Sequence, residues 1–209
     1  QALLAKEKAF TRAYDALNRE RRALPWAKVD KTYVCVVPSG RETLADLFAG
    51  CTQLIVNHFK SGPGWTEGCV GCSFGADHVN GALVHLAQRD VSYVAVSRAP
   101  LAEIEAFKRR MGWSFTWVSS FGSDFNYDFH VSFTPEDAAA GTAYYNYATQ
   151  PYTGEEGAGL SVFYKDDGEI FHTYSTYARG GELGLGTYVL LDMTPKGRDE
   201  HGPHHGLVD

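Results

Sequence analysis

The spacing of apolar residues divides the middle of the chain into alternating strands and helices. Apolar runs at residues 53–59 and 91–97, and a shorter one at 115–119, predict strands of a buried parallel sheet. Between them, residues 69–88 and 101–111 carry apolar positions at helical spacing. This order predicts a parallel, right-handed β-α-β-α-β unit.

The N-terminal segment has the pattern of a surface helix. Residues 2–23 carry an approximate apolar stripe among Lys, Glu and Arg, and Pro25 ends the pattern. We expect this helix to lie against the outside of the domain or against a second subunit. A short strand is expected over 32–37. The predicted organisation is a helical extension over 1–30 and one domain over 31–209.

The second half of the chain is less regular. Residues 160–174 predict a β-hairpin, because two alternating β-rich runs flank a turn that ends in Asp-Gly. Residues 182–193 predict a final helix. Asp124 and Asp128 are candidates for metal or acid–base chemistry, but the aromatic residues beside them favour a turn with Asp caps. Residues 144–147 fit an edge strand, a dimer contact or a loop.

Composition narrows the class of protein. The chain has 209 residues, of which 44% are hydrophobic and 21% charged, as in a soluble globular domain. Its formal net charge of −6 disfavours nucleic acid as a partner. No apolar run approaches the roughly 20 residues that cross a membrane. Four cysteines do not form a disulfide scaffold in a chain of this length, so we expect a reducing, cytoplasmic setting.

Two of the cysteines carry the candidate chemistry. Cys69 and Cys72 stand at a predicted junction between a strand and a helix, where a helix N-terminus stabilises a thiolate. Cys69 is therefore the candidate nucleophile, and Cys72 can attack a mixed disulfide formed at Cys69. A helical stripe predicts that Cys72 is buried and Cys69 lies at an exposed tip. The stripe consists of Cys69, Cys72, Ala76, Val79, Leu83 and Leu86.

Other interpretations of the pair remain open. A structural zinc site needs four ligands, and the chain has no second Cys pair, although His58 or His78 is a candidate ligand. A static disulfide and two plain buried cysteines are the further alternatives. We expect no metal and no cofactor. His201, His204 and His205 in the tail suggest metal binding, a mobile segment or a docking arm.

Two neighbours are candidate supporting residues. Thr66 lies three residues before Cys69, and its hydroxyl either bonds the thiolate or a peroxide oxygen, or only caps the incoming helix. Trp65 is either a flat platform beside the thiols or a packed aromatic side chain.

The order of elements, with a Cys pair opening the first helix of the unit, resembles the thioredoxin fold. Thr66-x-x-Cys69 and residues 94–115 look like the branch of alkyl-hydroperoxide reductases and thiol-specific antioxidant proteins. The chain more closely resembles the bacterial DUF899 family of thioredoxin-like proteins. The similar segments are residues 21–26, 44–48, 69–74, 96–100, 122–129 and 173–179. The resemblance implies a three-layer α/β/α fold with a central mixed sheet.

The sequence also departs from the thioredoxin-like pattern. Redox proteins of this fold carry a cis-proline before the late hairpin, whereas residues 157–160 contain no proline. Peroxide-reducing relatives place an arginine nearby, and residues 151–159 contain none. Arg98 or Arg179 is a candidate replacement, with a structural ion pair as the alternative. Pro63 lies one residue closer to the nucleophile than in the peroxidase motif.

The sequence therefore supports several functions. The first is a thiol–disulfide oxidoreductase that uses Cys69 and Cys72. The others are a thiol peroxidase, a non-catalytic thioredoxin-like binding module, and a metal-binding protein. The expected partner is a thiol, disulfide or peroxide substrate. Nucleic acid and membrane are not expected, and a homodimer is the favoured assembly.

Overall fold

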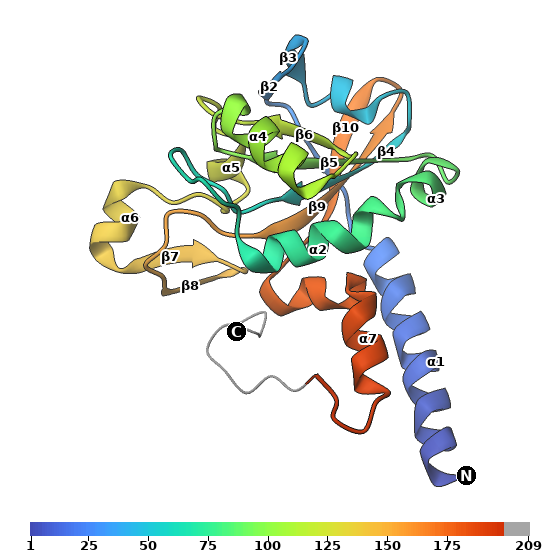
Figure 1. The fold of residues 1–209 in the computed structure, drawn as a ribbon. Coiled ribbons are helices and arrows are strands. Elements are labelled where there is room, and N and C mark those ends of the chain that lie inside the picture. Colours follow the sequence, from blue (N-terminus) through green and yellow to red (C-terminus); the bar gives the residue numbers. More distant parts are fainter. Residues whose placement is uncertain (199–209) are drawn as a thin grey trace.

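The computed structural model describes residues 1–198, apart from the side chains of Arg179 and Leu183. Within these residues, an eight-stranded mixed sheet has the order β1-β10-β9-β4-β5-β6-β2-β3 (Figure 1). Its strands are β1 (Ala27–Lys28), β2 (Val34–Val37), β3 (Gly40–Thr43), β4 (Gln53–His58), β5 (Val91–Ser97), β6 (Thr116–Ser119), β9 (Gly159–Asp166) and β10 (Glu169–Tyr177). β4, β5 and β6 are parallel, which confirms the predicted β-α-β-α-β unit.

The central strand β4 explains why the sheet has helices on both faces. Its alternate residues Leu54 and Val56 are fully buried in one core, which also contains Phe48 and Phe125. Ile55 packs on the opposite core. Burial on both faces requires the nearly continuous apolar run that predicted this strand. The three-layer α/β/α arrangement follows.

The helices divide between these layers. α2 and α4 share one core and lie on the same face of the sheet, whereas η1 and α5 contribute to the other (Figure 1). The helical segments are α1 (Ala2–Arg22), η1 (Asp46–Phe48), α2 (Val70–Asn80), α3 (Leu83–Ala87), α4 (Leu101–Met111), α5 (Phe125–Asp128), α6 (Pro135–Ala140), η2 (Ala178–Gly184) and α7 (Gly186–Asp192).

Two predicted helices are each interrupted. The helix expected over 69–88 ends at Gly81, and α3 then starts from Ala82. The helix expected over 182–193 is a 3-10 segment followed by the short α7. Glycine lowers helix stability, and α2 and η2 each end at or next to one.

The irregular region holds structure that the pattern did not predict. α6 begins with a capping box between Thr134 and Asp137. β7 (Thr142–Tyr145) and β8 (Ala148–Pro151) form a separate two-stranded sheet beside α6 (Figure 1). The tyrosine-rich segment is thus a strand that ends in a two-residue turn.

The acidic candidates of this region have a structural role. Asp124 and Asp128 both bind the Lys31 side chain, at 2.8 and 2.7 Å, and Asp128 also accepts a hydrogen bond from Tyr33. Asp124 is the N-cap residue of α5 but makes no side-chain capping bond. The expected Asp caps are therefore replaced by a lysine bridge, with Phe125 buried beneath it.

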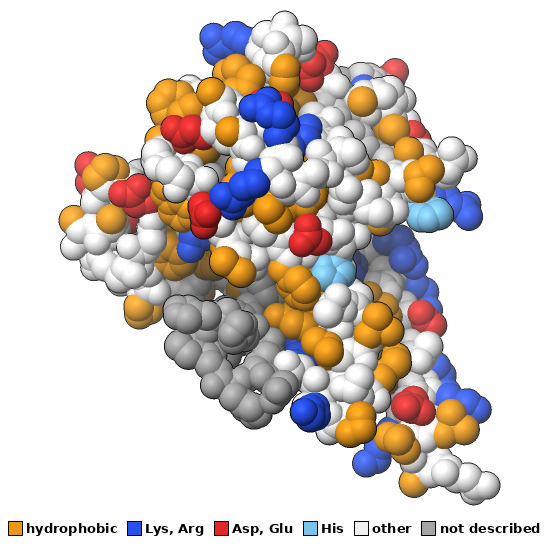
Figure 2. Space-filling model, viewed as in Figure 1, with side chains coloured by type: hydrophobic (Ala, Val, Ile, Leu, Met, Phe, Trp, Pro, Cys, Tyr) orange, Lys and Arg blue, Asp and Glu red, His pale blue; other side chains and the backbone are white. Residues whose placement is uncertain are grey.

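The N-terminal helix α1 is present as predicted, with three arginines in its last turn. None of its residues is buried. It extends away from the sheet, and apolar and basic side chains show on the surface where α1 and α7 lie (Figures 1 and 2). Arg21 contacts the domain through the ring of Tyr174, 4.9 Å away. The division of the chain at residue 30 stays a prediction.

Candidate redox site

The structure brings the two predicted thiols together where β4 leads into α2. Cys69 is the N-cap residue of α2, and both residues are thiols rather than a disulfide. The backbone N–H of Cys69 donates to the carbonyl of Lys60 at 3.2 Å, and Ser73 donates back to the Cys69 carbonyl. Cys69 and Cys72 are both half-buried, so the expected exposure of Cys69 and the expected burial of Cys72 are each only partly met.

The surroundings of the two sulfurs give them opposite acidities. The pKa of Cys69 is lowered, chiefly by hydrogen bonding from the Cys72 thiol and then by the N–H groups of Cys72 and Gly71. The pKa of Cys72 is raised by the same pairing and by burial. The backbone N–H groups of Gly71 and Cys72, in the first turn of α2, lack partners inside the helix and therefore stabilise negative charge on the Cys69 sulfur. At neutral pH the arrangement favours a thiolate at Cys69 and a thiol at Cys72.

Lys60 is a contributor that the sequence pattern did not identify. Its charge lowers the pKa of Cys69 and opposes the rise in the pKa of Cys72. Its backbone N–H donates to the sulfur of Cys72 at 3.4 Å. The sequence signal was a lysine directly after the buried strand, because the end of a parallel strand faces the start of the following helix.

A close approach fixes the loop just before Cys69. A Cβ atom on Gly68 would lie 2.6 Å from the ring of Phe59 and 3.0 Å from that of Phe107. Phe59 is 1% exposed and cannot move freely. Glycine at position 68 therefore lets the thiol pair sit directly on the aromatic core beneath α4.

An apolar cavity of about 140 Å³ lies beside the half-buried Cys72. Cys72 lines it together with Tyr93, Leu185 and the backbone of Ala158 and Gly159. The last two residues stand where thioredoxin-like redox proteins carry proline. Their place is fixed by Tyr145, whose hydroxyl donates to the Ala158 carbonyl at 2.7 Å.

The two supporting candidates are placed differently. Thr66 is exposed, and in the described part of the chain no hydrogen bond joins its hydroxyl to Cys69. Trp65 is half-buried, and its backbone N–H donates to the Gly62 carbonyl at 3.2 Å. Their roles at the thiol pair stay predictions.

Arg98 is held in an ion pair. Its guanidinium lies 2.6 Å from the carboxylate of Glu156, which is 1% exposed and also accepts from Ser132. Burial raises the pKa of Glu156, and Ser132 and Arg98 oppose this shift. A Cβ atom on Gly62 would lie 3.2 Å from the Glu156 carboxylate, so this pair lies close against the loop that leads to the thiols. The side chain of Arg179 is outside the described residues.

The histidines near the site have other partners. His78 uses one ring nitrogen on the Phe74 carbonyl at 2.6 Å and the other on the Thr187 hydroxyl at 2.8 Å. His58 is buried against Ser161. Among residues 1–198, no group of three or more His, Cys, Asp and Glu could hold a metal ion. His201, His204 and His205 lie outside the described residues.

The architecture and the comparisons define the class. The fold is thioredoxin-like. The sequence matches the model of the family described as "Bacterial protein of unknown function (DUF899)" over residues 1–208, and the chain belongs to that family. A search of curated proteins finds no match. In the described part of the chain, no helix is both long and apolar enough to span a membrane.

Solved structures with this fold include bacterial peroxiredoxins. A cysteine mutant of Xanthomonas campestris peroxiredoxin Q aligns with a TM-score of 0.51 and 13% identity, over 80% of this chain and 94% of that one. The bacterioferritin comigratory protein of the same organism, described for alkyl peroxide reduction, gives 0.50 and 14% over 78% and 93%. A Xylella fastidiosa PrxQ mutant gives 0.50 and 12%, over 79% and 94%. At these identities the likeness extends to the fold.

The relative sizes of the contributions that lower the pKa of Cys69 predict how variants change its titration. Its alkylation rate should rise with pH around a midpoint below the roughly 8.5 of an unperturbed thiol. Cys72→Ala should raise this midpoint most, because the Cys72 thiol is the largest cause of the lowered pKa. Lys60→Ala should raise it less. Iodoacetamide kinetics with peptide mapping measure each midpoint.

Lys8→Ala on the exposed helix α1 is the matched control and should leave the midpoint unchanged. Equal midpoints in wild type and Cys72→Ala would refute the assigned cause.

The contact at Gly68 predicts a steric effect. Gly68→Ala should lower the free energy of unfolding by about 1–3 kcal/mol, the usual effect of overpacking, and should change the reactivity of Cys69. Gly81→Ala is the control, because a Cβ atom there meets nothing within 4 Å. Denaturant unfolding and alkylation measure the two effects. Similar stabilities for both variants would contradict the close approach.

Proposed function

We propose that the protein is a thiol–disulfide oxidoreductase in which Cys69 attacks and Cys72 resolves. The observation that carries this proposal is the opposite shift in acidity of two adjacent thiols at the start of α2. A nucleophilic thiolate and a protonated neighbour are what the two successive steps of thiol–disulfide exchange require.

In the first step, the Cys69 thiolate attacks one sulfur of a substrate disulfide. A bond forms between that sulfur and Cys69, and the other substrate sulfur leaves as a thiolate that takes a proton. Cys72 then loses its proton and attacks the sulfur of Cys69. The second substrate thiol leaves, the substrate is reduced by two electrons, and the protein holds a Cys69–Cys72 disulfide. An external dithiol restores both thiols.

The apolar cavity beside Cys72 supports this assignment. Ala158 and Gly159, at the start of β9, line this cavity with Cys72, so a substrate can lie there in place of contacts made by a proline loop. Apolar walls suit a substrate with an apolar group next to its disulfide.

A thiol peroxidase is the second candidate. The fold it shares with a protein described for alkyl peroxide reduction favours it. The Cys69 thiolate would attack a peroxide oxygen, forming a sulfenic acid and releasing an alcohol, and Cys72 would then form the disulfide and release water. The exposed position of Thr66 and the ion pair of Arg98 with Glu156 disfavour it.

A non-catalytic binding module is the third candidate, in which the thiols are dispensable. It predicts that a variant lacking both thiols keeps full function in cells.

The proposal also includes a cytoplasmic setting, a homodimer, and the lack of nucleic acid and membrane partners. The net charge and the exposed α1 support it.

The experiment measures dithiothreitol-driven reduction of hydroxyethyl disulfide and of cumene hydroperoxide. Cys69→Ser should abolish disulfide reduction, and Cys72→Ser should accumulate a mixed disulfide at Cys69 visible by mass spectrometry. Cys51→Ser, at an isolated half-buried cysteine, is the control and should retain activity.

The two substrates separate the candidates. Peroxide consumption faster than that by dithiothreitol alone, without disulfide reduction, would replace the first candidate by the second. If neither substrate reacts with the wild type, both enzymatic assignments fail.

A further inference from the structure

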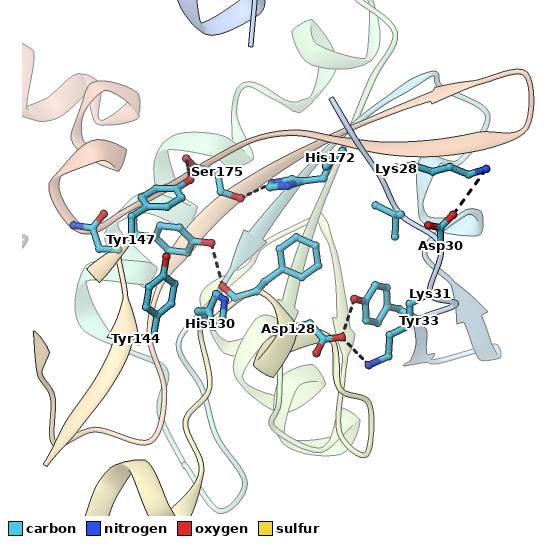
Figure 3. Close-up of a pocket in the computed structure, with 15 residues that line it drawn as sticks. Lys28, Asp30, Lys31, Tyr33, Asp128, His130, Tyr144, Tyr147, His172 and Ser175 are labelled. Carbon is cyan, nitrogen blue, oxygen red and sulfur yellow. Dashed lines mark hydrogen bonds and ion pairs between the residues drawn. The ribbon is translucent and has the colours of Figure 1, made fainter. Parts of the chain in front are cut away.

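A second cavity, of about 390 Å³, is lined by residues that include neither Cys69 nor Cys72, and Figure 3 shows this lining. Strand β10, the segment after β1, the end of α5 and the turn between β7 and β8 surround it. Tyr177 is the residue that lines both this cavity and the one beside Cys72. The volume of this second cavity lies within the roughly 300–1,000 Å³ that is usual for small-molecule sites.

Backbone strain is concentrated at this cavity. Seven non-glycine residues in the described part of the chain have positive φ. Three of them line the cavity, namely His130 at 54°, Asn146 at 52° and Tyr147 at 64°. The two-residue turn at Asn146 and Tyr147 favours glycine at its second position, yet it carries tyrosine. Strained residues persist where the surrounding structure holds them, and they gather at functional sites.

The strained turn presents aromatic rings rather than hiding them. Tyr147 is anchored by its hydroxyl, which donates to the Ser175 carbonyl at 2.8 Å, but the residue is 64% exposed. Tyr144 is 46% exposed, and its ring lies 4.7 Å from that of His130. These tyrosines stand on one side of the cavity (Figure 3). Aromatic faces that stay open to a cavity suit a flat aromatic ligand.

The hydrogen bonds of His172 fix which nitrogen is an acceptor. Its Nε2 lies 3.0 Å from the Tyr174 carbonyl and 2.7 Å from the Ser175 hydroxyl. Because a carbonyl oxygen only accepts, Nε2 must carry the proton. Nδ1 is then an acceptor, and it has no hydrogen-bond partner among the described residues. The Ser175 hydroxyl is in turn hydrogen-bonded to the Ser161 hydroxyl at 2.7 Å. This buried series of hydrogen bonds holds the His172 tautomer.

Charged side chains on the other side of the cavity are already paired. Lys31 binds Asp128 at 2.7 Å, and Tyr33 donates to the same carboxylate at 2.8 Å. Lys28 lies 3.8 Å from Asp30 (Figure 3). Since these charges compensate one another, the cavity offers no net charge to an ion. An uncharged ligand that donates a hydrogen bond fits better.

We propose that this cavity binds a phenolic small molecule, whose ring contacts Tyr144 and Tyr147 and whose hydroxyl donates to Nδ1 of His172. The rings supply the flat apolar surface, and the buried chain behind His172 presents an acceptor that lacks a donor. This site is independent of the redox proposal, because neither cysteine of the pair lines it.

Calorimetric titration of the full chain with β-naphthol tests the proposal, with its methyl ether as the matched probe. The ether keeps the ring but cannot donate a hydrogen bond, so it should bind about tenfold more weakly. N-acetyltyrosinamide forms a further arm. Binding as tight as that of β-naphthol would identify a tyrosine side chain as the source of the phenol, and weaker binding a free small molecule.

Variants assign the binding to this cavity. His172→Phe should remove the preference for β-naphthol over its ether, and Tyr144→Ala should weaken both probes. The Tyr144 side chain is exposed and packs on the His130 ring, so Tyr144→Ala should fold and keeps the test informative if His172→Phe does not fold. Phe10→Ala on α1 and Cys69→Ser should bind like the wild type. Equal binding of the two probes, or no saturable binding, would overturn the proposal.

Discussion

The candidate redox site depends on one interaction, the pairing of the Cys69 and Cys72 thiols at the N-terminus of α2, which lowers the pKa of Cys69 and raises that of Cys72. It makes one of two chemically identical groups more acidic and the other less acidic. Neither thiol would acquire its role alone, because the titration of such a pair belongs to both groups. The backbone N–H groups of the first turn and the charge of Lys60 also lower the pKa of Cys69, whereas Lys60 opposes the rise in the pKa of Cys72.

The rest of the fold places this pair. β4 is buried on both faces and ends at His58, two residues before Lys60, so the strand places the lysine and the loop near the start of α2. Gly68 allows that loop to lie against Phe59. From the other side, the ion pair of Arg98 and Glu156 lies close against the loop at Gly62. The site is thus held by contacts from several elements.

Local signals in the sequence predicted the elements whose chemistry is local. The apolar runs of β4 and β5, the glycine after α4 and the Asp-Gly turn of the late hairpin needed no tertiary information. The sequence pattern did not predict α6, although the residues of its capping box are visible in the sequence. β1 is two residues long and is defined by its pairing with β10, so the local sequence pattern could not predict it.

The site was predictable to the same extent. The place of Cys69 and Cys72 at the start of a helix followed from the pattern, whereas their catalytic roles stay predictions. The contribution of Glu156 was not predicted, because it is 58 residues from Arg98 and only the fold brings the two side chains together. The two interrupted helices show the same limit, since the cost of each glycine competes with packing that the sequence does not display.

The most direct test of the central claim adds one equivalent of glutathione disulfide to the reduced protein, with acid quenching and site-resolved mass spectrometry over time. The account predicts a glutathione adduct at Cys69 first, followed by its loss as the Cys69–Cys72 disulfide forms. An adduct that appears first at Cys72 or Cys51, or one at Cys69 that never resolves, would contradict the assignment of the two thiols.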